Sequence, residues 1–328
     1  MRFGLFIPQG WRQDLTGIDP REHWQTMSGL ARHADEGDAY ESIWVYDHFH
    51  AVPEPNGEAT HEAWSLINAF AASTSRVRLG QMCTCMAYRN PAYLAKVATT
   101  ADIISGGRVE MGIGAGWYEH EWLAYGYGFP SAGTRIAMLD EGVQIFKQMW
   151  TNGTATLDGE HYQVSGAQLA PLPLQVDGPP LWIAGGGEKK TLRIAAEHAA
   201  YTNFDGSPEG FAHKSEILRG HCEAIGRPFE EITRSANYNV VIGATEADVD
   251  DRIAWVEEHY SNSVPAKAAQ VAEEFRNGTL VGTPEQIVEK LQALQKLGMT
   301  YAITYFAEAA YDRSGIELFE NEVVPALR

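Results

Sequence analysis

Eight apolar stretches rich in β-branched and aromatic residues recur along the chain, separated by segments with helical periodicity. They cover residues 2–8, 42–47, 77–84, 108–115, 180–186, 199–204, 234–243 and 301–306. Between them, apolar residues recur at spacings of three and four, which predicts helices over 22–37, 62–73, 92–104, 134–150, 188–198, 208–225 and 284–297. Strands that alternate with helices indicate parallel pairing through crossover helices.

The number of these units favours a closed sheet. Eight strand–helix units without a spare edge strand fit a (β/α)8 TIM barrel better than an open doubly wound sheet. We therefore expect an α/β fold in which residues 1–328 form one barrel domain. Residues 151–179 and 245–280 are too long for simple connections and would be insertions after strands 4 and 7. "TATLDGEHYQV" in the first predicts a small hairpin, and the second predicts one or two extra helices.

Composition narrows the class of protein. Hydrophobic residues make up 45% of the chain and charged residues 21%, as in ordinary globular proteins. A net charge of −18 argues against binding to nucleic acid or anionic membranes. Pro8 interrupts the N-terminal apolar run before a signal-peptide core could form, and no other run is long enough to cross a bilayer. We expect a cytoplasmic protein with reduced thiols, whose partner is a small molecule.

In a (β/α)8 barrel, chemistry takes place at the carboxyl ends of the strands. One such end is "MGIGAGWYEHEW" at residues 111–122, where Gly112, Gly114 and Gly116 alternate. The spacing does not match the G-x-G-x-x-G fingerprint of dinucleotide-binding folds. Alternating glycines leave one face of a strand bare, so a flat ring could lie against the backbone. Close packing of the strand against its neighbours is the alternative.

A second glycine run, "AGGGEKKT" at residues 184–191, follows a predicted strand and leads into a predicted helix. Backbone amides at such a helix start can hold a phosphate. Lys189 and Lys190 would add positive charge in an otherwise acidic protein. The alternative is a glycine-rich turn with two solvated lysines.

"YDHFH" at residues 46–50 places Asp47, His48 and His50 at the end of the second strand. An Asp–His pair suits proton transfer, since imidazole titrates near neutrality and a carboxylate fixes its tautomer. We also considered a metal site formed with "EATHE" at residues 58–62. No closely spaced ligand set such as H-E-x-x-H is present, so we predict no metal.

Three runs together resemble the bacterial luciferase-like monooxygenase family, in the branch of oxidoreductases that use coenzyme F420. They are "SIWVYDHFH", "TSRVRLGQMCTCMAYRNPAYLAKVATTADIISGGRVEMGIGAGWYEHEWLAYGYGFP" and "LWIAGGGEKKTLRIAAEHAAYTNF". The resemblance covers roughly residues 1–245 and the last strand. It implies a (β/α)8 barrel with a flavin or deazaflavin ring at the carboxyl face of the strands, and family members are often homodimers.

The resemblance also assigns residues. The cofactor phosphate would lie on the loop of Gly185 to Gly187. Because the protein is otherwise acidic, we expect Lys189 and Lys190 to guide the polyglutamate tail of F420. A bulge with a non-prolyl cis peptide would fall near Gln81 and Met82. The positions implied to bind the cofactor are Asp47, His48, Gln81, Met82, Thr84, Gly116, Trp117, His120, Ala184, Gly185, Gly186 and Gly187.

On this basis we expect an F420-dependent oxidoreductase that transfers a hydride between C5 of the deazaflavin and a small organic substrate. His48 would transfer the proton and Asp47 would orient it, with His50 and Glu58 as weaker candidates. Trp117 stands where the sugar-phosphate dehydrogenases of the family carry a glutamate, which argues against glucose-6-phosphate as substrate. The alternatives are a monooxygenase that uses reduced FMN and a non-catalytic F420-binding protein.

Overall fold

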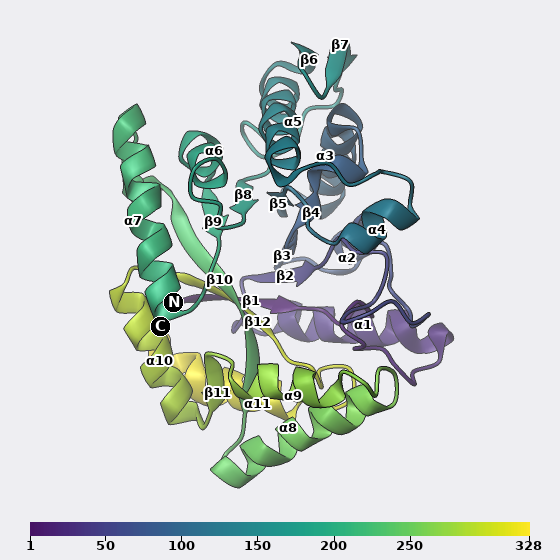
Figure 1. Cartoon of the computed structure of the whole chain (residues 1–328), viewed down its shortest axis with the longest axis vertical. Coiled ribbons are helices and arrows are strands. Elements are labelled where there is room, and N and C mark those ends of the chain that lie inside the picture. The colour runs from purple at the N-terminus through teal and green to yellow at the C-terminus, as the bar shows by residue number, and fades with distance from the viewer. The chain divides into compact units, whose positions relative to one another are not determined.

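The computed structural model describes residues 1–328, and their contacts divide the chain into two compact units (Figure 1). The first unit comprises Met1–Glu62, Phe204–His213 and Arg234–Arg328. The second unit comprises Ala63–Asn203 and Lys214–Thr233. Each contains a parallel sheet.

In the first unit, the strands pair in the order β11-β10-β12-β1-β2. Both neighbours of β1 hold it in register, since Gly4 lies opposite Ile303 on one side and Ser42 on the other. The strands are β1 (Arg2–Phe6), β2 (Ser42–Val45), β10 (Thr233–Ile242), β11 (Leu280–Gly282) and β12 (Tyr301–Tyr305). The helices are α1 (Pro20–Glu36), α8 (Glu246–Ser261), α9 (Ala268–Arg276), α10 (Pro284–Lys296) and α11 (Ser314–Leu318).

In the second unit, the order is β3-β5-β8-β9, and the short β4 pairs with the end of β5. The strands are β3 (Arg78–Gln81), β4 (Thr84–Cys85), β5 (Val109–Gly114), β8 (Leu181–Ala184) and β9 (Tyr201–Asn203). The helices are α2 (Ala63–Ser73), α3 (Pro91–Ser105), α4 (Glu119–Ala124), α5 (Ala132–Asn152) and α6 (Thr191–His198). Helix α7 (Pro208–Ile225) follows β9.

Together these elements supply the eight parallel strands and the intervening helices of a (β/α)8 TIM barrel, which confirms the predicted fold class. The insertions also fall where the sequence predicts them. After β5, the antiparallel strands β6 (Thr154–Asp158) and β7 (Gln163–Gln168) form the expected hairpin. After β10, α8 and α9 are the two extra helices.

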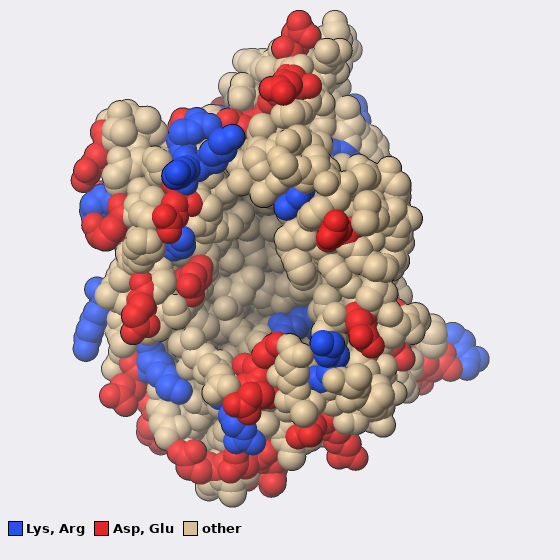
Figure 2. Space-filling view, viewed as in Figure 1, with Lys and Arg blue, Asp and Glu red and all other residues tan.

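Helix ends follow local sequence signals. Asn90 caps α3 by accepting hydrogen bonds from the amides of Ala92 and Tyr93, Pro91 fills the first helical position, and Gly106 ends the helix with a left-handed backbone. In α8, Thr245 and Asp248 form a capping box. The helix carries exposed acidic residues, and Figure 2 shows such side chains gathered over the α8 end of the first unit. No helix is both long and apolar enough to span a bilayer.

Candidate functional site

Asp47 and His48 directly follow β2 in the first unit. Asp47 is only 2% exposed, whereas His48 is half-buried. The indole of Trp11 stacks on the imidazole of His48, with 4.0 Å between ring centroids and 3° between ring planes. Trp11 also packs against Tyr46 at 4.3 Å. An aromatic residue that follows β1 therefore fixes the plane of the His48 ring.

Buried polar contacts join the segment after β1 to the end of β2. The Gln9 amide donates to the carbonyl of Tyr46 at 2.8 Å and accepts from its amide at 2.8 Å. Asp14 accepts hydrogen bonds from the amides of Gln9 and Gly10. Gly10 has a φ of 99°, and a Cβ there would collide with the carbonyl of Ala59. The loop that carries Trp11 is therefore held in one conformation from both sides.

His50 and Glu58, the weaker candidates for proton transfer, and His61 of the run at residues 58–62 have different environments. His61 lies in a buried network, with its Nε2 3.0 Å from Nδ1 of His23. Burial, and then the neighbouring His23, lowers the pKa of His61. His50 and Glu58 are half-buried in the segment that follows β2, and the Glu58 amide donates to Asn56. His61 thus has a structural role.

In the second unit, the segment between β3 and β4 forms the bulge that the resemblance implies. The peptide bond between Met82 and Cys83 is cis. The Thr84 hydroxyl donates to Oε1 of Gln81 at 2.8 Å. Gln81 is only 1% exposed, and its Nε2 has no hydrogen-bond partner in the chain. A buried amide donor of this kind calls for an acceptor from outside the chain.

The alternating glycines of β5 are explained by packing against this bulge. A Cβ on Gly112 would collide with the carbonyl oxygen of Gln81. One on Gly114 would lie 2.6 Å from Sγ of Cys83, and one on Gly116 would lie 2.6 Å from Sγ of Cys85. The space beside each glycine is therefore filled by the protein itself, and the close-packing alternative accounts for the spacing. No bound cofactor ring is needed to explain why these three positions lack a Cβ.

The second glycine run forms a loop between β8 and α6. Gly185 has a φ of 119° and its amide donates to the carbonyl of Asn203 at 2.8 Å. The absence of a side chain at Gly187 leaves room for Thr191, because a Cβ on residue 187 would lie 2.6 Å from Oγ1 of Thr191. Ala184 and Gly186 are half-buried, while Lys189 and Lys190 are exposed. The loop thus presents main chain beside the start of a helix, as an anion site requires.

The remaining predicted positions lie around α4. Trp117 is 60% exposed and stacks on Tyr118, and His120 is exposed. The carbonyl of Gly116 accepts a hydrogen bond from Arg135 at 3.2 Å. Trp117 and His120 thus lie at the surface of the second unit.

A sequence profile of the family described as luciferase-like monooxygenase matches residues 1–301. The chain belongs to this family. An F420-dependent glucose-6-phosphate dehydrogenase of Kineococcus radiotolerans is 28% identical over 321 residues, which cover 92% of this chain and 93% of the relative. The oxygenase component of a flavin-dependent trigonelline monooxygenase of Acinetobacter baylyi is 26% identical, with 99% and 95% covered.

Solved structures agree in fold with this luciferase-like enzyme. An F420-dependent secondary alcohol dehydrogenase in complex with an F420–acetone adduct aligns over 100% of this chain and 99% of its own length. The TM-score is 0.80 and the sequence identity is 19%. With the family match, the named relatives make the protein an enzyme of the luciferase-like oxidoreductases.

The residues of the luciferase-like enzyme fit a flavin or deazaflavin ring in one specific respect. These rings carry carbonyl oxygens and ring nitrogens along one edge, and the orphaned Nε2 of Gln81 is a donor suited to such acceptors. The indole Nε1 of Trp11 in the first unit is also buried without a partner. The family resemblance implied Gln81, whereas no motif pointed to Trp11 or Arg12. Their only sequence signal is the polar and aromatic run "QGWR" directly after the first strand.

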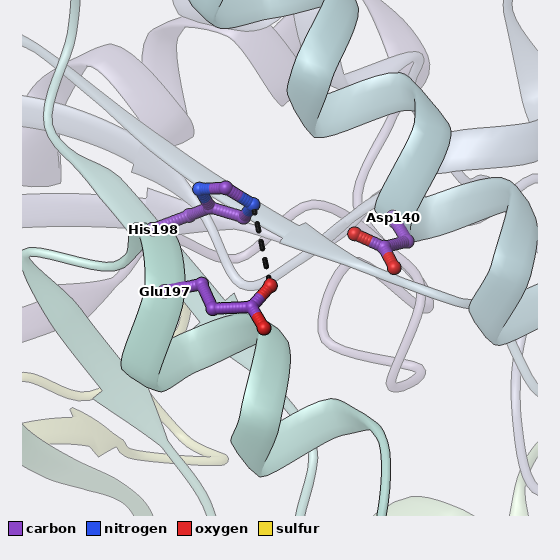
Figure 3. A group of neighbouring side chains, drawn as sticks. All are labelled: Asp140, Glu197 and His198. Carbon is purple, nitrogen blue, oxygen red and sulfur yellow. Dashed lines mark ion pairs between the residues drawn. The ribbon is translucent and has the colours of Figure 1, made fainter. Parts of the chain in front are cut away.

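One cluster in the second unit has the composition of a metal site. Figure 3 shows Asp140 on α5 facing Glu197 and His198 on α6, with ligand atoms within 4.8 Å of one another. Arg193 pairs with both carboxylates, at 2.8 Å to Asp140 and 2.6 Å to Glu197. Burial, followed by Lys147, lowers the pKa of His198. The guanidinium already neutralises these carboxylates, so the cluster is an ion-pair network between two helices.

Proposed function

We propose that the enzyme is an F420-dependent oxidoreductase that transfers a hydride between C5 of the deazaflavin and a small organic substrate. Family membership and the F420-dependent dehydrogenases among its relatives support the reaction class. The observation that supports a bound ring is the buried Nε2 of Gln81, which has no hydrogen-bond partner in the chain and would donate to the edge of a flavin or deazaflavin; the F420-dependent relatives favour deazaflavin. When bound, deazaflavin supplies hydride exchange at C5 and reacts poorly with oxygen.

The chain's own residues then have distinct tasks. His48 exchanges a proton with the substrate, and Asp47 sets its orientation. Trp11 holds the imidazole plane by stacking, so that the ring loses no further rotational freedom in the reaction. The loop from Ala184 to Gly187 holds the cofactor phosphate through the backbone amides of Gly186 and Gly187, since that of Gly185 donates to Asn203. Met82, Gly116, Trp117 and His120 complete the proposed binding surface, and we propose a homodimer.

A monooxygenase using reduced FMN is the second candidate, favoured by the flavin-dependent relative from Acinetobacter baylyi. Fluorescence titration of the purified protein with F420 and with FMN separates the two. F420 should bind at least about tenfold more tightly, which corresponds to about 1.4 kcal/mol. Tighter binding of FMN together with oxygen uptake would overturn the F420 assignment.

Two variants test the phosphate loop in the same titration. Gly186→Asp adds bulk and negative charge to the loop and should weaken F420 binding by about tenfold or more. Gly220→Asp is the matched control, because Gly220 is exposed on α7 with nothing within 4 Å of a Cβ. Equal affinity in both variants would remove the loop from the phosphate site.

A further inference from the structure

The first unit contains a cavity of about 300 Å³ at the carboxyl ends of β1, β2 and β12 and against β10. This is within the range of small-molecule sites, and the carboxyl end of barrel strands is where substrates bind. The cavity is mixed in character, with aromatic walls and few charges. Its principal side chains are Phe6, Tyr46, Tyr238, Tyr305, Arg12 and Asn239.

Arg12 is the only basic residue that lines the cavity, and neighbouring groups fix its position. Its Nη1 donates to Oδ1 of Asn239 at 2.7 Å. The guanidinium lies over the ring of Tyr305 at 4.1 Å and near that of Phe275 at 5.4 Å. The backbone carbonyl of Arg12 accepts a hydrogen bond from Tyr260 at 2.7 Å. Such a guanidinium is preorganised for a ligand, since its conformational freedom is already lost.

The guanidinium has neutral polar partners, the Asn239 amide and the hydroxyls of Tyr46 and Tyr260, and no ion pair with a carboxylate within 4.0 Å. The nearby Asp14 carboxylate instead accepts from the amides of Gln9 and Gly10 and from the Tyr305 hydroxyl. Burial has the largest effect on the pKa of Arg12 and lowers it, but Tyr305, Tyr46 and Tyr260 together raise it, and the net shift is upward, so the guanidinium stays charged. A guanidinium has five N–H donors, so it can bind a ligand in addition to these three polar side chains.

The cavity contains one opposing charge. The Asp205 carboxylate also lines it, is exposed and accepts a hydrogen bond from the Ser207 amide at 2.9 Å. An anionic group is therefore favoured at the Arg12 end and disfavoured at the Asp205 end. This polarity gives an entering ligand one orientation.

We propose that this cavity binds the carboxylate of the organic substrate, with Arg12 as its two-pronged partner and the aromatic walls around an apolar or planar body. Arginine and carboxylate match in geometry, and the paired hydrogen bonds are charge-assisted. The proposal rests on the proposed function, because it names the class of substrate that the oxidoreductase accepts.

Benzoate and benzamide test the proposal by calorimetry, because they share size and shape and differ in charge. Wild-type protein should bind benzoate about tenfold more tightly or better, as expected for charge-assisted hydrogen bonds. Arg12→Gln should abolish this preference. Arg276→Gln is the matched control, since Arg276 is exposed on α9 and pairs with Asp250; it should retain the preference.

A second variant covers the case in which Arg12→Gln does not fold. Asn239→Asp keeps the guanidinium and places a carboxylate against Nη1, so that the internal ion pair competes with the ligand. It should reduce the benzoate preference to less than about threefold. Equal binding of benzoate and benzamide by the wild type, or a full preference in Asn239→Asp, would overturn the carboxylate site.

The carboxylates of the F420 tail could bind to Arg12 in the same way as a substrate carboxylate. Benzoate binding in the presence of saturating F420 distinguishes these two ligands. Benzoate should still bind when F420 is saturating. Displacement by F420, but not by a deazaflavin without a tail, would assign the site to the cofactor and overturn the substrate assignment. A retained benzoate preference in a protein that does not bind F420 would overturn the proposed function and leave the carboxylate site standing.

Discussion

The carboxyl ends of the strands are built differently in the two units. In the first unit, side chains provide the functional surface: Trp11 stacks on His48, and Arg12 lies over Tyr305. In the second unit, main chain has a larger part, through the bulge packed on the β5 glycines and the loop at Gly185 to Gly187, with Gln81 as a buried side-chain donor. On the proposed function, proton transfer and substrate recognition depend on side chains, whereas the cofactor phosphate is held by backbone.

The largest expected effect, a fall in kcat, comes from replacing His48, the proposed proton donor of the first unit. His48→Ala should lower kcat about 100-fold or more, because general acid–base catalysis is lost, while F420 affinity stays within about twofold. The measurement is the change in F420 absorbance with a substrate that the wild type turns over. His213→Ala, at an exposed histidine of α7 outside the proposed binding surface, is the control. A fully active His48→Ala variant would refute the assignment.

In the second unit, substitution of a β5 glycine should instead destabilise the fold, because neighbouring atoms leave no space for a side chain. Gly112→Ala puts a Cβ against the carbonyl of Gln81 and should destabilise the fold by about 3 kcal/mol, measured by urea unfolding. Gly220→Ala is the control, because this exposed helical glycine has open space around it and alanine should be neutral or stabilising there. Unfolding free energies that agree for both variants would contradict the packing explanation.

Trp11 tests whether stacking positions His48. Trp11→Leu should lower kcat about tenfold with little change in F420 affinity, and Trp11→Phe should restore most of it because a flat ring remains. The pH dependence of kcat should also move in the leucine variant, since the environment of the imidazole changes. A similar loss in both variants, with an unchanged pH profile, would leave Trp11 a purely structural role.

The smallest expected effect is the contribution of His61, in the first unit, to the pH dependence of the free energy of unfolding. The pKa of His61 is lowered by burial and by His23, so the unfolded chain binds a proton more readily than the folded one. The free energy of unfolding should therefore fall as the pH drops from about 6.5, the unperturbed value of histidine. His61→Gln should reduce this dependence, and the control His120→Gln should not. The test compares urea unfolding at pH 7.5 and 5.5.

The sequence predicted the fold well because the barrel strands are short apolar runs that are buried almost throughout, as in β2, β5 and β12. The elements it missed, α4, α11 and β11, are too short to show a period. For the site, the Asp47–His48 pair and the two glycine runs were visible as motifs. The stacking partner Trp11 and the Arg12–Asn239 contact were not, since they join residues distant in sequence. The packing role of the β5 glycines likewise depends on a neighbouring strand.

Each alternating glycine at the end of β5 and just beyond it faces one residue of the segment from β3 to β4: Gly112 faces Gln81, Gly114 faces Cys83 and Gly116 faces Cys85. In directed evolution, the effect of a substitution at one of these glycines should therefore depend on the residue that the glycine faces. Saturation mutagenesis at Gly112, Gly114 or Gly116 alone should yield few folded clones. Libraries that vary the facing positions jointly are therefore the productive route to new specificities.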